Sequence, residues 1–163
     1  MKRVLKDSGN IFCRCDKRAS HYIKILLDEV FGTSCFQSEI IWTYKRWSNS
    51  KKGLLPSHQS IFFYSKTKRN KFNILYTNYS ATTNIDQILQ ERSKNGLGKA
   101  VYKKTGQALV PAKAKRGVPL LDTWDIPFLN PKAQERTGYP TQKLLLLLDR
   151  IIQTSSDEGG ALS

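Results

Sequence analysis

The chain has 163 residues, a 39% hydrophobic fraction and a formal net charge of +14. This length suits one domain of ordinary size with a modest apolar core. The longest apolar run, residues 144–148, is far shorter than the roughly 18–20 residues of a membrane helix. Residues 1–7 carry charges but no apolar stretch, which is unlike a signal peptide. We therefore expect a cytoplasmic protein and no membrane partner.

The positive charge is concentrated in the middle of the chain. Residues 45–116 hold sixteen Lys/Arg against only Asp86 and Glu91, a net of +14. Residues 1–44 have a net of +2 and residues 117–163 a net of −2. A basic block between two near-neutral ones is typical of a polyanion-binding segment on an ordinary scaffold. The alternative is a lysine-rich surface that only meets solvent.

The first elements follow an α/β rhythm. Residues 1–7 resemble the end of a helix that stops at Gly9, and residues 10–15 are typical of a strand with Asp16 just beyond it. Residues 21–30 place apolar side chains at helical spacing after Ser20. Helix, glycine and strand in this order favour an α/β fold.

A strand is expected next at residues 36–44, followed by a loop at residues 45–56 and a second strand at residues 57–65. Residues 85–89 allow a short helix, while residues 93–117 show little periodicity. Their Gly96-Leu97-Gly98 stretch does not indicate a nucleotide loop, because it neither follows a clear strand nor opens a helix.

The C-terminal part regains order. We expect structure at residues 119–126 and a helix over residues 141–153, where the apolar face is broad and helix propensity is good.

The three cysteines indicate free thiols. Cys13, Cys15 and Cys35 are an odd number and include no C-x-x-C pair. A metal site that joins them with His58 is the alternative, but the spacing matches no structural zinc pattern. We expect no metal site and buried, unpaired cysteines.

Four segments, in order, resemble one family. They are LKDSGNIFCRCDKRASHYIKILLDEVFG, FQSEIIWTYKRW, HQSIFFYSK and LDTWDIPFLNPKAQERTGYPTQK. Together they resemble the beta-class DNA amino-methyltransferases of bacteria, which include adenine-N6 and cytosine-N4 methylases and the modification subunits of type III restriction systems. The resemblance covers nearly the whole chain, and GYPTQK and SHYIKILLDEVFG are its most specific parts.

The resemblance implies a partial Rossmann-like, S-adenosylmethionine-dependent methyltransferase fold of the α/β class. Its sheet is expected to be mostly parallel. Residues 1–79 are expected to form one part of the methyltransferase core, residues 80–118 a basic target-recognition insert, and residues 119–163 the return to the core.

Two motifs of the family do not occur in these 163 residues. One is the catalytic D-P-P-Y-like loop, which accepts the hydrogens of the exocyclic amine and stacks the flipped base. The other is the D-P-F-x-G-x-G-T-like cofactor loop, whose glycines let the backbone approach the ligand. Leu144 also stands where the family usually has proline. We therefore expect a DNA (adenine-N6) methyltransferase by family that is a truncated, inactive or incomplete fragment alone, without catalytic residues of its own.

The resemblance implies a cofactor-binding role for Thr141, Gln142 and Lys143, since a helix start with a hydroxyl and a cation suits a carboxylate. Asp16, at the end of a strand, is a second candidate for S-adenosylmethionine. For Thr141 and Asp16 the alternative is a structural helix cap.

The basic block corresponds to the family's target-recognition region, so its cations are candidates for phosphate contacts with double-stranded DNA. These candidates are Lys45, Arg46, Lys94, Lys99, Lys103, Lys104, Lys113, Lys115 and Arg116. Tyr44 and Trp47 adjoin the basic loop and are candidates for meeting the duplex with it; the alternative is that these aromatics pack in the core and only the lysines face solvent. Trp42, Phe62 and Phe63 are expected in the core.

Two other functions compete with methyl transfer. One is a non-catalytic DNA-binding remnant that uses residues 45–116 alone. The other is an unrelated basic RNA-binding protein, which would need exposed aromatics on adjacent strands. A methyltransferase of this kind also implies partners, either a complementary methyltransferase chain or a restriction subunit.

Overall fold

The computed structural model describes residues 2–45, 52–79, 90–106, 108–109, 117–130 and 132–159. The chain divides into two compact units. Unit 1 comprises Met1–Ile74 and Leu121–Ser163, and unit 2 comprises Leu75–Leu120. Unit 1 is of the α/β class, as expected.

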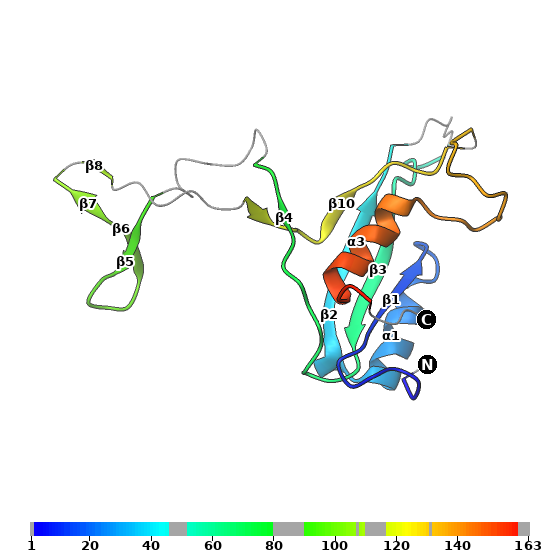
Figure 1. Ribbon diagram of the computed structural model, residues 1–163, viewed down its shortest axis with the longest axis horizontal. Coiled ribbons are helices and arrows are strands. Elements are labelled where there is room, and N and C mark those ends of the chain that lie inside the picture. Colours follow the sequence, from blue (N-terminus) through cyan, green and yellow to red (C-terminus); the bar gives the residue numbers. More distant parts are fainter. Residues whose placement is uncertain are drawn as a thin grey trace. The chain divides into compact units, whose positions relative to one another are not determined.

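The main sheet of unit 1 contains β1 (Asn10–Cys15), β2 (Phe36–Thr43), β3 (His58–Ser65) and β10 (Thr123–Asp125). Their order is β1-β3-β2-β10. β3 pairs antiparallel with both β1 and β2, and β10 pairs parallel with β2. β1, β2 and β10 therefore run in one direction, and β3 alone runs in the other (Figure 1).

The expectation of a mostly parallel sheet is wrong for these four strands, because two of the three neighbouring pairs are antiparallel. The physical reason is the position of β3. A helix lies between β1 and β2 and returns the chain for a parallel strand, whereas residues 44–57 join β2 to β3 with no helix among their described residues. The reversed β3 then lies between two strands that share a direction.

Helix α1 (Ser20–Phe31) covers one face of the sheet, followed by the short helix η1 (Thr33–Cys35). Alternate residues of β1 and β3 point to this face because side chains alternate along a strand. The buried residues of this core are Cys15, Phe31, Cys35, Phe62 and Tyr64.

A polar contact fixes α1 to β3. The Tyr64 hydroxyl donates to Oδ1 of Asp28 at 2.6 Å, and the Lys24 ammonium donates to Oδ2 at 2.7 Å. Hydrogen bonds from Lys24 and Tyr64 lower the pKa of the Asp28 carboxyl. The carboxylate thus satisfies a hydroxyl whose residue is 0% exposed.

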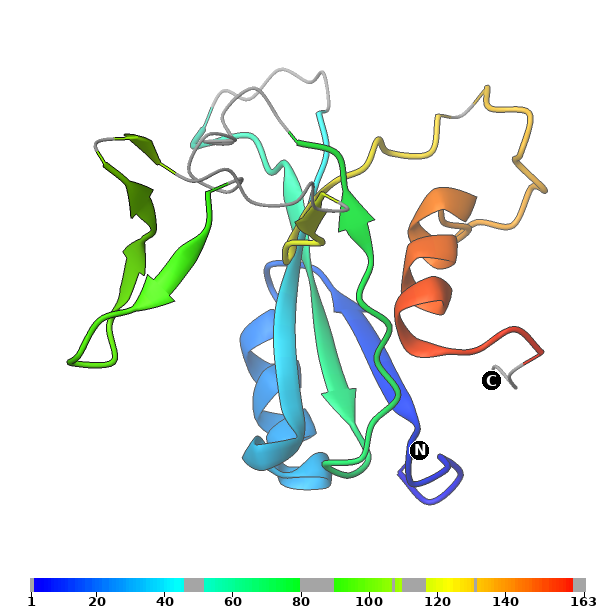
Figure 2. The same ribbon diagram turned by 60° about the vertical axis from the view of Figure 1, so that its left-hand side comes forward.

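Helix α3 (Leu145–Ser155) lies on the opposite face of the sheet (Figure 2). Trp42 and Trp124 are register partners on this face, and the Arg150 guanidinium of α3 lies 5.3 Å from the Trp124 ring centroid. At the far end of the helix, Asn73 donates from its backbone to Thr154 O at 2.8 Å and from its side chain to Gln153 O at 2.9 Å. Unit 1 is therefore a three-layer arrangement of helix, sheet and helix.

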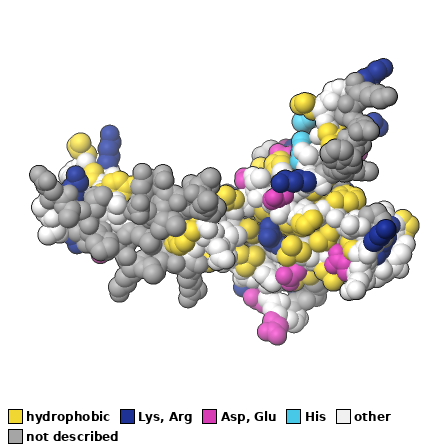
Figure 3. Space-filling model, turned by 90° about the horizontal axis from the view of Figure 1, so that it is seen from above, with side chains coloured by type: hydrophobic (Ala, Val, Ile, Leu, Met, Phe, Trp, Pro, Cys, Tyr) yellow, Lys and Arg dark blue, Asp and Glu magenta, His cyan; other side chains and the backbone are white. Residues whose placement is uncertain are grey.

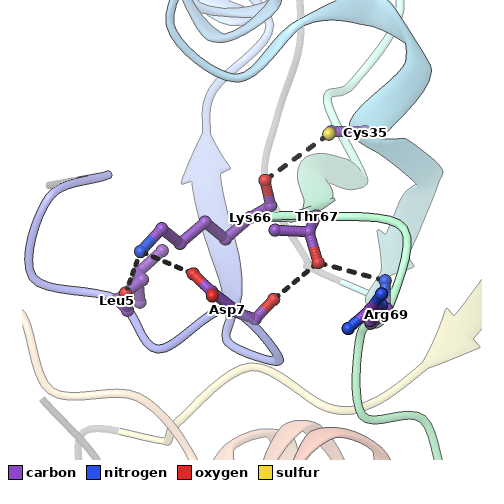
Figure 4. Close-up of polar contacts among 6 residues, drawn as sticks. All are labelled: Leu5, Asp7, Cys35, Lys66, Thr67 and Arg69. Atoms are coloured by element: carbon purple, nitrogen blue, oxygen red, sulfur yellow. Dashed lines mark hydrogen bonds and ion pairs between the residues drawn. The ribbon is translucent and has the colours of Figure 1, made fainter.

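The N-terminal segment is tied to the chain that follows β3 (Figure 4). The Lys66 ammonium donates to Leu5 O at 2.6 Å and pairs with Asp7 Oδ1 at 3.1 Å. The Thr67 hydroxyl donates to Asp7 O at 2.8 Å. Residues 2–7 form turns, so the expected helix end was wrong. Tertiary hydrogen bonds rather than helical ones satisfy these carbonyls.

Among its described residues, unit 2 contains three short antiparallel ladders. Their strands are β4 (Tyr76–Thr77) with β9 (Val118–Pro119), β5 (Arg92–Lys94) with β6 (Ala100–Tyr102), and β7 (Lys104–Thr105) with β8 (Ala108–Leu109). Gly117 permits the close approach of β4 and β9, because a Cβ there would lie 2.3 Å from Thr77 O and its φ is +125°.

The expected strands at residues 10–15, 36–44 and 57–65 and the helix at residues 21–30 are confirmed within one residue at each end. The short helix expected at residues 85–89 lies outside the described residues. Among the helices that the structure describes, none is long and apolar enough to cross a membrane.

Candidate cofactor and nucleic-acid sites

The carboxyl ends of three strands meet at one edge of the unit 1 sheet. Because β1, β2 and β10 run in the same direction, the segments that leave Cys15, Thr43 and Asp125 all start there. In α/β sheets this edge is the usual place for a ligand. It brings Asp16, which follows β1, to the same edge as Lys45, which follows β2.

Trp42 fixes the chain that leaves β10 at this edge. Its indole Nε1 donates to Ile126 O at 2.8 Å, and both residues are almost completely buried. The Phe128 ring lies 5.4 Å from the Tyr44 ring. Tyr44 is therefore a buried core residue rather than one exposed toward DNA, and Trp47 lies outside the described residues.

Gln142 holds the loop before α3 in place. Its Oε1 accepts from the backbone and hydroxyl of Thr137 at 2.8 and 3.0 Å, and its Nε2 donates to Glu135 O at 2.6 Å. The side chain thus closes a turn across residues 135–142. Thr141 beside it is exposed.

Lys143 lies half-buried just before α3, and its Nζ donates to Thr141 O at 2.5 Å. Burial, together with the positive charge of Arg14 on β1, lowers the pKa of Lys143. The helix expected from residue 141 begins only at Leu145, because the Gln142-bound turn occupies the preceding residues, and Leu144 makes no capping side-chain bond. Cations beside uncapped helix amides suit an anionic group such as a carboxylate.

Asp16 caps the turn that leads into α1. Its Oδ1 accepts hydrogen bonds from the backbone of Arg18 and Ala19, both at 3.0 Å. Its backbone oxygen also accepts from Ser20 at 3.0 Å. The capping bonds hold the Asp16 carboxylate at the edge where the cofactor role was expected. Both of these bonds use Oδ1, and Oδ2 takes part in neither.

The cysteines lie on the α1 face of the sheet as unpaired thiols. Burial raises the pKa of Cys15 to about 11, with the neighbouring Cys13, Asp16 and Glu39 adding to the shift. Burial also raises the pKa of Cys13. Within the described residues, no group of three His, Cys, Asp or Glu side chains is placed to hold a metal ion.

The predicted DNA-binding cations divide into three groups. Lys45 lies exposed at the carboxyl edge of unit 1, and Lys94, Lys99 and Lys104 are exposed in unit 2. Lys103 pairs with Glu91 at 3.1 Å. The others, Arg46, Lys113, Lys115 and Arg116, lie outside the described residues.

The structure adds Arg92 and Tyr102, which sequence reasoning missed. The Arg92 guanidinium lies 5.1 Å from the Tyr102 ring centroid, and the two residues are register partners across the β5–β6 ladder. The signal was present as Asn95, Gly96 and Gly98, residue types common in turns, between two short segments.

The end of unit 1 seen in Figure 3 shows hydrophobic side chains among separate charges of both signs. Phe128, whose ring lies beside that of Tyr44 at this edge, is 44% exposed. This end of unit 1 is therefore not a uniform cationic surface. The described cations with exposed side chains are denser in the β5–β6 ladder of unit 2.

Unit 1 thus offers an α/β sheet with loops at its carboxyl edge, and unit 2 of the same chain is a β unit with an excess of basic residues. The family comparison is more specific: the model of the N6/N4 DNA methylase family matches residues 1–162. The chain therefore belongs to this DNA methylase family, in agreement with the resemblance of the four sequence segments.

Two curated relatives are similar to the chain. The Type II methyltransferase M.HpaI of Haemophilus parainfluenzae is 27% identical over 157 residues, which cover 96% of this chain and 42% of the relative. The Type III restriction-modification enzyme StyLTI Mod subunit of Salmonella typhimurium (strain LT2) is 31% identical over 67 residues, which cover 40% of this chain and 10% of the relative. The chain thus spans less than half the length of either relative.

Proposed function

We propose that this chain is the target-holding part of a DNA amino-methyltransferase that acts on adenine N6. The observation that carries the proposal is the family match across residues 1–162. The M.HpaI relative extends along almost all of this chain, which supports a shared scaffold rather than one shared motif. S-adenosylmethionine would supply the electrophilic methyl group of the reaction.

The proposed contribution of unit 1 is one wall of the cofactor site. Lys143, with Arg14 nearby, supplies positive charge beside the uncapped start of α3, and this chemistry fits the carboxylate of a methionine moiety. Gln142 positions the loop through its three hydrogen bonds, and Thr141 offers an exposed hydroxyl. Asp16 at the same edge offers an acceptor for hydroxyl groups of the ligand.

The chemistry itself needs groups that these 163 residues do not contain. An adenine amine is a weak nucleophile, because its lone pair is delocalised into the ring. A D-P-P-Y-like loop must accept its hydrogens before the methyl group can transfer. We propose that the 163-residue chain alone does not methylate DNA, and that it works with a chain or segment that carries this loop and the glycine loop.

The basic segment is the proposed DNA-binding part. The proposed contacts include four lysines with exposed side chains, Lys45, Lys94, Lys99 and Lys104. Lys103 is not among them, because it pairs with Glu91. Arg46, Lys113, Lys115 and Arg116 share the segment's charge. Unit 2 alone has eight Lys/Arg and two Asp/Glu, which supports its role as a target-recognition insert with phosphate contacts. The relation to a type III modification subunit favours a restriction-modification setting with a restriction subunit as partner.

Three measurements on the purified chain test this function. Fluorescence anisotropy with a labelled duplex should show DNA binding that weakens steeply as salt rises, whereas a flat response would contradict the role of the basic segment. Transfer of tritiated methyl groups from S-adenosylmethionine to the same duplex should stay at background. Isothermal calorimetry should likewise detect no tight cofactor binding. Methylation by the chain alone would refute the need for the missing loops.

A further inference from the structure

The β5–β6 ladder has two chemically different faces. Its register pairs Arg92 with Tyr102, Ser93 with Val101 and Lys94 with Ala100. Because side chains alternate across a strand, Arg92, Lys94 and Tyr102 project from one face. Ser93 and Val101 project from the other.

The cations on the two faces differ in their partners. Lys103, next to Tyr102 in sequence, pairs with Glu91 at 3.1 Å, and its backbone N–H donates to Glu91 O at 2.8 Å. A carboxylate therefore offsets the charge on the Ser93 face. On the other face, Lys94 is exposed and has no acidic partner among the described residues. Among the paired positions 91–94 and 100–103, the charge without an acidic partner thus lies on the face of Arg92 and Lys94, which we call the cationic face.

Arg92 is held in a defined position on this face. Its guanidinium lies 5.1 Å from the Tyr102 ring centroid, and Nη2 donates to the Tyr102 hydroxyl at 3.3 Å. A guanidinium that rests on an aromatic ring keeps its planar donor edge and loses less freedom when it binds. Such an edge forms two hydrogen bonds with O6 and N7 of guanine, which lie in the major groove.

The size of the ladder selects the groove. Two paired strands lie about 4.8 Å apart before their side chains are added. The major groove, about 12 Å wide, admits a two-stranded ribbon, whereas the minor groove is only about 6 Å wide. The turn at Asn95 is also rigid, because Asn95 Oδ1 accepts from the backbone of Leu97 at 3.1 Å and of Lys99 at 2.9 Å. The hairpin is therefore a narrow, preformed element with one cationic face.

We propose that the cationic face of the β5–β6 hairpin enters the major groove of duplex DNA, where Arg92 contacts a guanine edge and Lys94 contacts a phosphate. The assignment rests on the proposed function, because it takes the DNA substrate from it. It deepens that function by naming the element and the residues that meet the bases.

A matched pair of lysine variants tests which face of the hairpin contacts DNA. Anisotropy with a labelled mixed-sequence duplex is measured over a range of salt for the 163-residue chain and for Lys94→Gln and Lys103→Gln. Both variants remove one charge from the same exposed hairpin. Lys94→Gln should lower the slope of log K against log salt by about 0.9, the value for one phosphate contact, and Lys103→Gln by less than half of that. Equal effects of the two variants, with wild-type binding intact, would overturn the inference and leave the proposed function standing.

Arg92→Lys tests the guanine contact, because it keeps the charge but loses the planar edge. For the wild type, replacing guanine by 7-deazaguanine, which lacks N7, should weaken binding about fivefold or more, and Arg92→Lys should abolish this difference. A wild type that binds both duplexes equally would overturn the guanine assignment. A wild type without salt-dependent binding to either duplex would instead overturn the proposed DNA-binding function itself.

Discussion

Replacement of Trp42 by phenylalanine should destabilise unit 1, because one buried backbone carbonyl loses its hydrogen-bond donor. Trp42 donates its indole N–H to Ile126 O at 2.8 Å, and Ile126 is 0% exposed. Phenylalanine retains the aromatic ring but cannot donate, so the Ile126 carbonyl loses its hydrogen bond away from water. An unsatisfied buried acceptor costs about 1–3 kcal/mol, and the smaller ring adds about 1 kcal/mol. We expect the free energy of unfolding to fall by about 2–4 kcal/mol.

Trp124→Phe is the matched control. Trp124 pairs with Trp42 in the sheet and donates the same kind of bond, at 2.7 Å, to Leu121 O. Leu121 is 63% exposed, so water can replace the lost donor at its carbonyl. The hydrogen bond then contributes only about 1 kcal/mol, and the smaller ring adds about as much again. This variant should therefore lose about 2 kcal/mol, less than Trp42→Phe is expected to lose.

Urea unfolding followed by far-ultraviolet circular dichroism measures both variants without relying on tryptophan fluorescence. The midpoint should move while the slope stays constant, which indicates a change of stability alone. The reasoning is refuted if Trp124→Phe destabilises the protein as much as Trp42→Phe or more. That outcome would mean that burial of the acceptor does not determine the cost.

Three further variants or treatments have defined outcomes. Leu147→Ala should lower the stability of unit 1 by about 3 kcal/mol, because Leu147 is 2% exposed, whereas Leu145→Ala at 60% exposure should change it by about 0.5 kcal/mol or less in the same urea assay. Gly117→Ala should cost about 1–3 kcal/mol and remove hydrogen-exchange protection from β4 and β9, because its methyl group meets Thr77 O. Alkylation of Cys15 by iodoacetamide should be slow at pH 8 and accelerate only toward pH 11, since its raised pKa keeps the thiol protonated below that value. The same shift means that the neutral thiol favours the folded state below pH 9, the ordinary value, and that this contribution is lost as the pH rises toward 11.

Local patterns sufficed for the elements of unit 1. The apolar spacing from Ile23 to Val30 and the β-rich segments predicted α1, β1, β2 and β3 because these elements bury one regular face each. Strand direction did not follow from such patterns. A buried strand has the same alternation whichever way it runs, so the reversed β3 became visible only through its pairing with β1 and β2.

The sequence predicted which residues belong to the candidate site better than it predicted the contacts that these residues make. GYPTQK indicated the approach to α3, but the late start of the helix depends on Gln142, whose three hydrogen bonds reach back to Glu135 and Thr137. The sequence left two positions open for Tyr44, toward DNA with the basic loop or in the core, and the structure buries it beside Phe128. Contacts between residues that are far apart in the sequence decide where such side chains lie, and these contacts cannot be read from composition.

The distribution of burial bears on how the proposed DNA-contacting residues can change without loss of the fold. The core of unit 1 contains Trp42, Ile61 and Tyr64, each 1% exposed or less, so substitutions there carry a large stability cost. Every described residue from Arg92 to Gly106 is exposed. Substitutions of its exposed side chains therefore cost little folding energy, usually within about 0.5 kcal/mol, while the proposed DNA contact predicts that each cation removed from the cationic face changes DNA affinity directly. Under the proposed function, recognition can thus vary in the β5–β6 hairpin while the carboxyl edge of the sheet stays constant.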